Sequence, residues 1–186
     1  MSLIFLTRDK INFGGIYLGA VKTKSVIHFG NGYIAGLCGV VNENNTVRVT
    51  RHFETFQNLE LVNEGDIHAR GRQYGFLTKE SFVFQQPQIL RPMSIMLHQG
   101  NTCIFGNTLI DDKPMFEEAL SFIEASTLGV QEKLIHVLKK YKRIGLDVRV
   151  TGQSCTDIYF LLGDHYGNLL LERQISNNTT DPIDLL

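Results

Sequence analysis

Residues 25–39 carry the feature that most constrains the fold, two short apolar segments joined by an Asn-Gly turn. The segments are Ser25–Phe29 and Tyr33–Gly39, and Gly30-Asn31-Gly32 separates them. Asn-Gly readily adopts the positive φ angles that a two-residue hairpin turn needs. We therefore predict an antiparallel β-hairpin over these residues.

The same pattern of short β-rich segments bounded by turn formers recurs along the chain. Leu3–Thr7 and Phe13–Gly19 flank the turn Asp9–Asn12 and predict an opening hairpin. Glycines inside these segments indicate bulges or close approach of another backbone. Further strands are expected at Ser81–Phe84, Met93–Leu97, Thr102–Gly106, Val148–Val150, Asp157–Leu162 and Leu169–Glu172.

Helices are expected in three places. The apolar residues of segment 44–61 fit both the two-residue period of a strand and the 3.6-residue period of a helix. We favour a helix because the segment is long for a strand. Asp111-Asp112 and Pro114 suit the start of a helix whose apolar stripe is Phe116, Ala119, Leu120 and Ile123. A second stripe comprises Val130, Leu134, Val137, Leu138 and Tyr141, and Gly145 ends that helix. Residues 63–80 are polar and predict a loop with a short helix.

Groups of strands alternating with helices predict an α+β fold, a four-layer α/β/β/α sandwich of two antiparallel sheets. With 186 residues, the chain has the length of one domain, which we place at residues 1–175. The polar residues 176–186 are expected to form a flexible tail.

Composition excludes several classes of function. Eighteen Lys and Arg against 19 Asp and Glu leave a net charge of −1, which argues against nucleic-acid binding. No apolar run approaches the roughly 20 residues of a membrane helix, and the first residues do not resemble a signal peptide, so we expect a cytoplasmic protein. Three cysteines without a CxxC motif predict neither a disulfide framework nor a metal site, and no cofactor is indicated.

Residues 24–39 resemble one block of the proteasome-type N-terminal-nucleophile (Ntn) hydrolases. In that family a lysine opens a strand, a tight turn follows, and the next strand ends in Ala-Gly-x-x-Gly, here Lys24 and Ala35–Gly39. The likeness is greatest to the peptidase subunit of the bacterial two-component ATP-dependent protease. Ile104–Thr108 and Ser154–Leu161 are similar to the family's glycine-serine turn and late strand pair.

The resemblance implies hydrolysis of peptide or amide bonds by the first residue of the processed chain. Ser2 would be the nucleophile after removal of Met1, with its α-amine as the base. Lys24 would be the charge partner, the Gly39 backbone N–H an oxyanion donor, and Asn107 would occupy the position of a common serine. The family also implies a homo-oligomeric ring and a peptide or protein substrate.

Two other functions remain open from the sequence. Gly19, Ala20 and Val21 occupy the region where the family has an acidic residue, which favours a catalytically inactive structural or assembly subunit. Alternatively, Cys38 and His52 would be nucleophile and base of a glutamine deamidase. The deamidase requires residues 47–53 to form a strand, against the helix predicted above.

Overall fold

The fold was analysed in a computed structural model that describes residues 2–19, 26–38, 73–85, 94–107, 113–143 and 157–175. Strands and helices follow one another as hairpins, then a helix pair, then a last hairpin. They are β1 (Ser2–Arg8), β2 (Asn12–Gly19), β3 (Val26–Gly30), β4 (Tyr33–Cys38), β5 (Gln73–Thr78), β6 (Phe82–Gln85), β7 (Ser94–Gln99), β8 (Thr102–Asn107), α3 (Lys113–Ala125), α4 (Val130–Arg143), β9 (Asp157–Asp164) and β10 (Leu169–Ile175).

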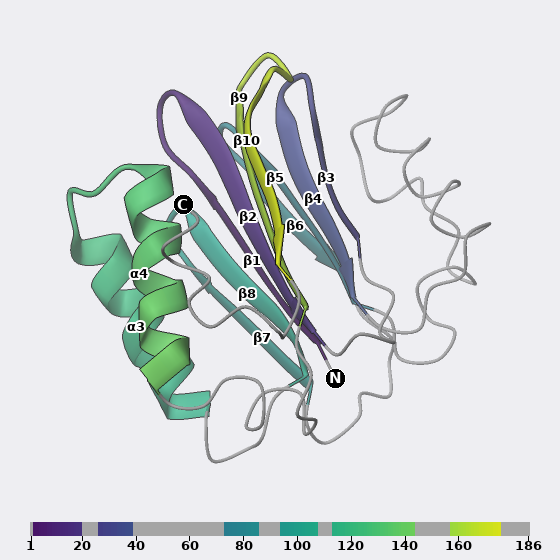
Figure 1. Cartoon of the computed structure of the whole chain (residues 1–186). Coiled ribbons are helices and arrows are strands. Elements are labelled where there is room, and N and C mark those ends of the chain that lie inside the picture. The colour runs from purple at the N-terminus through teal and green to yellow at the C-terminus, as the bar shows by residue number, and fades with distance from the viewer. Residues whose placement is uncertain are drawn as a thin grey trace.

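The strands form two antiparallel sheets stacked face to face. One sheet has the order β10-β9-β2-β1-β8-β7, and the other has the order β3-β4-β5-β6. Helices α3 and α4 cover the outer face of the six-stranded sheet (Figure 1). The predicted α+β sandwich of two antiparallel sheets is therefore confirmed, with three layers in the described residues. The helix predicted at 44–61 for the fourth layer lies outside the described residues.

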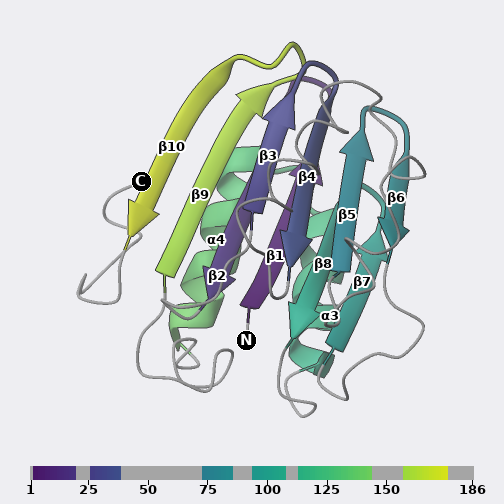
Figure 2. The ribbon, with the colours of Figure 1, turned by 90° about the vertical axis from the view of Figure 1, so that its right-hand side faces the viewer.

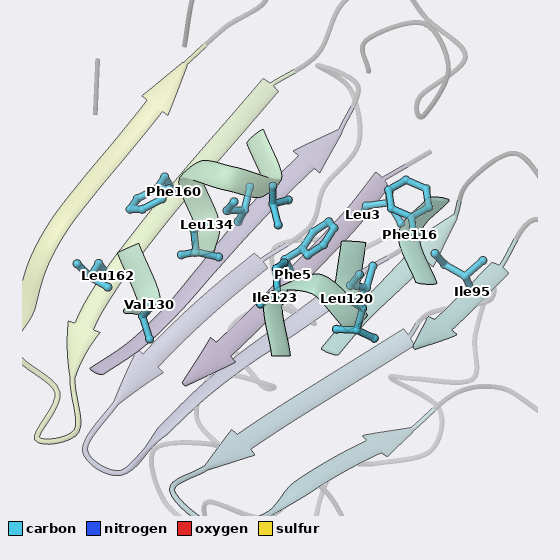
Figure 3. Close-up of a cluster of buried hydrophobic side chains, with 13 residues drawn as sticks. Leu3, Phe5, Ile95, Phe116, Leu120, Ile123, Val130, Leu134, Phe160 and Leu162 are labelled. Carbon is cyan, nitrogen blue, oxygen red and sulfur yellow. The ribbon is translucent and has the colours of Figure 1, made fainter. Parts of the chain in front are cut away.

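The core has two layers that meet at the central strand β1. Leu3 and Phe5 pack in the layer beneath α3 and α4 (Figure 3). Ile4 and Leu6 point the other way, into the layer between the sheets. Because neighbouring residues of a strand face opposite sides, the apolar run at the start of the chain fills both layers.

Close packing between the layers of the sandwich depends on glycine. A Cβ at Gly36 of β4 would lie 2.9 Å from Ile4 Cγ2 and 3.0 Å from the Phe105 ring. A Cβ at Gly14 of β2 would lie 2.7 Å from Leu134 Cδ1 of α4. The strand glycines thus make room for side chains of the neighbouring layer, rather than for the close approach of another backbone that the sequence predicted.

One element was predicted wrongly. Residues 73–78, assigned to a loop, form β5, an interior strand of the four-stranded sheet. Phe76 and Leu77 are both buried, so the strand lacks the polar alternation that identifies a half-exposed strand. Gly75 gave the segment a loop-like composition, yet a Cβ there would lie 2.6 Å from the Phe105 ring.

The other predicted strands and both later helices are confirmed, apart from features that lie outside the described residues. The first helix runs from Lys113 to Ala125 with Phe116, Ala119, Leu120 and Ile123 buried, as predicted. The features outside the described residues are the Asp111-Asp112 cap, Gly145, the strand at 148–150 and the tail at 176–186.

The strand directions give the sandwich two different ends. The hairpin turns at residues 9–11, 31–32, 79–81, 100–101 and 165–168 gather at one end, which we call the turn end (Figure 2). The other end, where β1 begins and β4 and β8 end, we call the open end. The contacts between the sheets show that their hairpin turns lie at the same end. Ile4 packs at Gly36, whereas Leu6 and Ile34, which are both nearer to their turns, pack at Gly15.

Hydrogen bonds tie the sheets together at the turn end. Arg8 of β1 donates from Nη1 to the carbonyls of Thr78 and Ser81, in the other sheet, at 2.7 Å for Ser81. The Gly32 N–H donates to the His165 carbonyl at 2.8 Å. Two hairpin turns of the four-stranded sheet are thus each fixed to the six-stranded sheet.

Candidate active site at the open end

Ser2 begins β1, the strand that lies between β2 and β8. Ser2 is paired with Gly19 of β2, and the next residue, Leu3, is paired with Gly106 of β8. The predicted nucleophile is therefore the first residue of β1, at the open end of the sandwich.

Asn107 lies at the same end, as the last residue of β8. It is paired with Ser94 of β7 and follows Gly106, which is directly opposite Leu3. Gly106 has a φ of 130°, a region that residues with a Cβ rarely adopt. The glycine that the family likeness singled out is therefore required by the backbone beside the start of β1.

Cys38 ends β4, and the four-stranded sheet brings this strand end over the start of β1. Gly36 contacts Ile4, and Cys38 lies two residues further toward the open end. Cys38 is paired with Gln73, the first residue of β5. The structure thus brings the backbones of Ser2, Cys38 and Asn107 to one end of the sandwich.

The remaining predicted site residues are Lys24, Gly39 and His52, and all three lie outside the described residues. Gly39 directly follows Cys38, and Lys24 precedes β3 by two residues. Their roles stay predictions.

Sequence reasoning missed Gln73, which was assigned to a loop. Its side chain is only 1% exposed, and its Nε2 donates to the main-chain carbonyl of Ile95 at 3.0 Å. Ile95 belongs to β7 in the six-stranded sheet, so the amide bridges the two sheets at the open end. No motif marks this glutamine, and only the correct assignment of β5 would have identified it.

Asp157, the first residue of β9, lies in the same row as Ser2 and Gly19. Gly19 is paired with Ser2 on one side and with Asp157 on the other. The family's acidic residue is lacking at the end of β2, but an acidic residue begins the neighbouring strand in the same row. The signal was the long-range pairing of β2 with β9, which a local motif does not reveal.

Among the described residues, Tyr159 and Cys103 have raised pKa values with clear causes. On β9, Tyr159 Oη donates to Glu172 Oε1 at 2.6 Å, and partial burial together with this carboxylate raises the pKa of the phenol. Cys103 of β8 is fully buried, and burial raises the pKa of its thiol. A thiol that stays protonated is a poor nucleophile, so Cys103 acts as a core residue.

His165 belongs to the turn end and is remote from Ser2. It is 5% exposed, its ring lies 4.5 Å from that of Phe13, and its carbonyl accepts the Gly32 N–H. The hydrogen bond from Gly32 to this residue fastens the two sheets together.

Within the part of the chain that the structure describes, no three His, Cys, Asp or Glu side chains gather as a metal site would require. No helix in that part is long and apolar enough to cross a membrane.

Comparisons with known proteins support the fold. No protein-family model matches the chain, and no curated protein matches it. Among solved structures, protein SPO2555 from Silicibacter pomeroyi, of the family DUF1028, is similar with a TM-score of 0.66 and 14% identity, covering 99% of this chain and 85% of its own. The chain therefore shares the two-sheet sandwich fold of that protein. At this identity the likeness shows the fold alone.

A weaker similarity links the chain to the Gly-1 mutant of Anbu from Hyphomicrobium sp. strain MC1. It has a TM-score of 0.45 and 9% identity, covering 97% of this chain and 87% of that one. A likeness this slight carries no argument about function.

Proposed function

We propose that this protein is an Ntn hydrolase that cleaves peptide or amide bonds at the open end of the sandwich. The observation that carries the proposal is the place of Ser2. It begins the central strand, in register with Gly19, where the ends of β4 and β8 meet the start of β1. An N-terminal hydroxyl and α-amine at this position would lie at the open end of the sandwich.

The proposed reaction begins when removal of Met1 frees the α-amine of Ser2. The amine takes the proton from the hydroxyl as Oγ attacks the substrate carbonyl, and the same proton then passes to the leaving amine as the C–N bond breaks. Water then hydrolyses the resulting ester. An α-amine has an unperturbed pKa of about 7.7–8, which suits a base near neutral pH.

The supporting groups are those that the family resemblance implies. Lys24 would favour the neutral α-amine and stabilise developing negative charge, and the Gly39 N–H would donate to the oxyanion. Asn107, at the end of β8, would complete the polar surroundings of Ser2. We also propose a cytoplasmic homo-oligomeric ring, which light scattering of the purified protein would test.

The test is the intact mass of the purified protein with and without a β-lactone. Acylation would open the lactone ring and leave an ester on Ser2, without loss of atoms. The proposal expects loss of Met1 and one adduct, absent from Ser2→Ala and present in Ser121→Ala, which removes an exposed hydroxyl on α3. Retention of Met1 without an adduct would overturn it.

A glutamine deamidase is the second candidate because Cys38, the last residue of β4, also lies at the open end. It predicts deamidation of a glutamine substrate that Cys38→Ser abolishes and Ser2→Ala leaves intact. If neither variant changes any activity, the inactive assembly subunit is the remaining alternative, and it would still form the ring.

A further inference from the structure

We propose that Gln73 is a positioning residue for the nucleophile, an inference that rests on the function proposed above. Gln73 is the first residue of β5, its side chain is 1% exposed, and it is paired with Cys38 at the end of β4. It therefore lies at the open end, within the sandwich and without access to bulk solvent.

The hydrogen bond of Gln73 fixes the spacing of the sheets there. Nε2 donates to the Ile95 carbonyl at 3.0 Å, across from one sheet to the other. At the turn end, equivalent ties come from Arg8 and from Gly32. The hairpin turns of the described residues lie at the turn end, so at the open end a side chain that spans the gap helps to hold the two sheets in register.

The strand register connects this bond to the nucleophile. Ile95 is paired with Gly106, and Gly106 is paired with Leu3, the residue after Ser2. A shift of β7 would thus be passed through β8 to the start of β1. Misplacing a reacting group by about 1 Å can cost about a hundredfold in rate, so a small shift in this row matters.

Other buried polar side chains do not share this position. Of those that the structure describes, Thr7, Arg8, Thr102 and His165 lie toward the turn end, and Lys133 is on α4. Gln73 is the one that begins a strand at the open end. A buried amide is costly unless it is hydrogen-bonded, which makes its bond to Ile95 the reason for its presence.

Three variants test the proposal through the rate constant of acylation by the β-lactone and the lactone's binding constant. Gln73→Met keeps the length of the side chain and removes the N–H donor. Thr102→Val is the matched control, since it removes buried hydrogen bonds to Thr7 and Glu124 far from Ser2. We expect Gln73→Met to lower the acylation rate constant about tenfold with unchanged lactone binding. Thr102→Val should leave both constants unchanged.

Gln73→Glu provides a pH readout that a merely structural role would not give. A neutral carboxyl can donate its O–H to the Ile95 carbonyl, whereas a carboxylate cannot. Burial favours the neutral form, so lowering the pH from about 8 to about 5 should restore it. The rate of Gln73→Glu divided by that of the unmodified protein should rise over this range, while the ratio for Gln73→Met stays constant.

The outcomes separate this inference from the proposed function. A Ser2-dependent adduct that forms at the same rate in Gln73→Met overturns the positioning role alone, as does an equal loss in Thr102→Val. Absence of any adduct in the unmodified protein overturns the proposed hydrolase and the positioning role with it. Amide exchange adds a second readout, since faster exchange at Leu3 and Gly106 is expected in Gln73→Met and not in Thr102→Val.

Discussion

The turn end and the open end of the sandwich are built from the same strands but differ in what holds them. At the turn end, tight turns and hydrogen bonds from Arg8 and Gly32 fasten one sheet to the other. Asp164 accepts bonds from the Tyr166 and Asn168 N–H groups and fixes the last turn. At the open end, the strands Ser2–Arg8, Tyr33–Cys38 and Thr102–Asn107 begin or end side by side.

The difference separates stability from proposed chemistry. The hydrogen bonds of Arg8 and Gly32 at the turn end join one sheet to the other and so help to secure the fold. The open end gathers residues with nucleophilic or hydrogen-bonding groups next to a glycine with a positive φ, Gly106. We therefore expect substitutions at the turn end to lower stability without a specific effect on catalysis, and substitutions at the open end to affect catalysis first.

The largest effect on stability is expected at Arg8. Arg8→Met would leave the carbonyls of Thr78 and Ser81 without their charged donor, and a hydrogen bond to a charged group contributes about 1.5–3 kcal/mol. We predict a fall of about 3 kcal/mol in the free energy of unfolding, measured by urea denaturation. Lys10→Met removes an exposed charge from the adjacent turn and should change stability by less than about 0.5 kcal/mol. Equal stability of the two variants would contradict the structural role given to Arg8.

A pair of glycine substitutions compares the ends directly. Gly36→Ala places a methyl group 2.9 Å from Ile4, and Gly163→Ala places one against the Phe29 ring near the turn end. Overpacking of this kind costs about 1–3 kcal/mol, and we expect both variants to lose stability in that range. Only Gly36→Ala should also slow acylation, because it forces the sheets apart beside Ser2. Equal acylation rates in the two variants would remove the functional distinction between the ends.

A smaller, pH-dependent effect is expected at Asp164. The bonds from the Asn168 side chain and from the Asn168 and Tyr166 N–H groups hold the pKa of this carboxyl below its usual value. Its contribution is present above the unfolded pKa of about 3.9 and is lost as the pH falls through the folded value. Urea midpoints measured from about pH 5 downward should therefore fall less steeply in Asp164→Asn. An unchanged slope in Asp164→Asn would contradict the assignment.

The smallest effect is expected from thiol labelling of the folded protein. Burial raises the pKa of the Cys103 thiol, so iodoacetamide should leave this residue unmodified until the protein unfolds. Peptide mass spectrometry would measure the labelled fraction. Rapid labelling of Cys103 would show that the layer between the sheets opens readily.

Much of the fold could be predicted from the sequence because its signals are local. The Asn31-Gly32 turn and the Phe116, Ala119, Leu120 and Ile123 stripe each define an element within a few residues. β5 was missed because both its faces are buried, which removes the alternation that marks an exposed sheet. Burial by distant strands is a tertiary property that a window of residues does not contain.

The candidate site could be predicted only where a motif reports it. Ser2 and Asn107 came from the family resemblance, and the structure places their backbones at one end of the sandwich. Gln73 and Asp157 enter the same end through pairing with Cys38 and Gly19, residues far away in the sequence. The pairing register of strands that are distant in the sequence determines which residues become neighbours, and no local sequence pattern encodes that register.

The most direct test of the open end as an active site is to map the residue that the β-lactone acylates. The protein would be treated with the lactone, digested, and sequenced by tandem mass spectrometry, with Ser2→Ala in parallel. We predict a single ester on an N-terminal peptide that begins with Ser2, and no ester in the variant. An adduct that persists in Ser2→Ala, or an N-terminal peptide that keeps Met1 and carries no ester, would contradict the account.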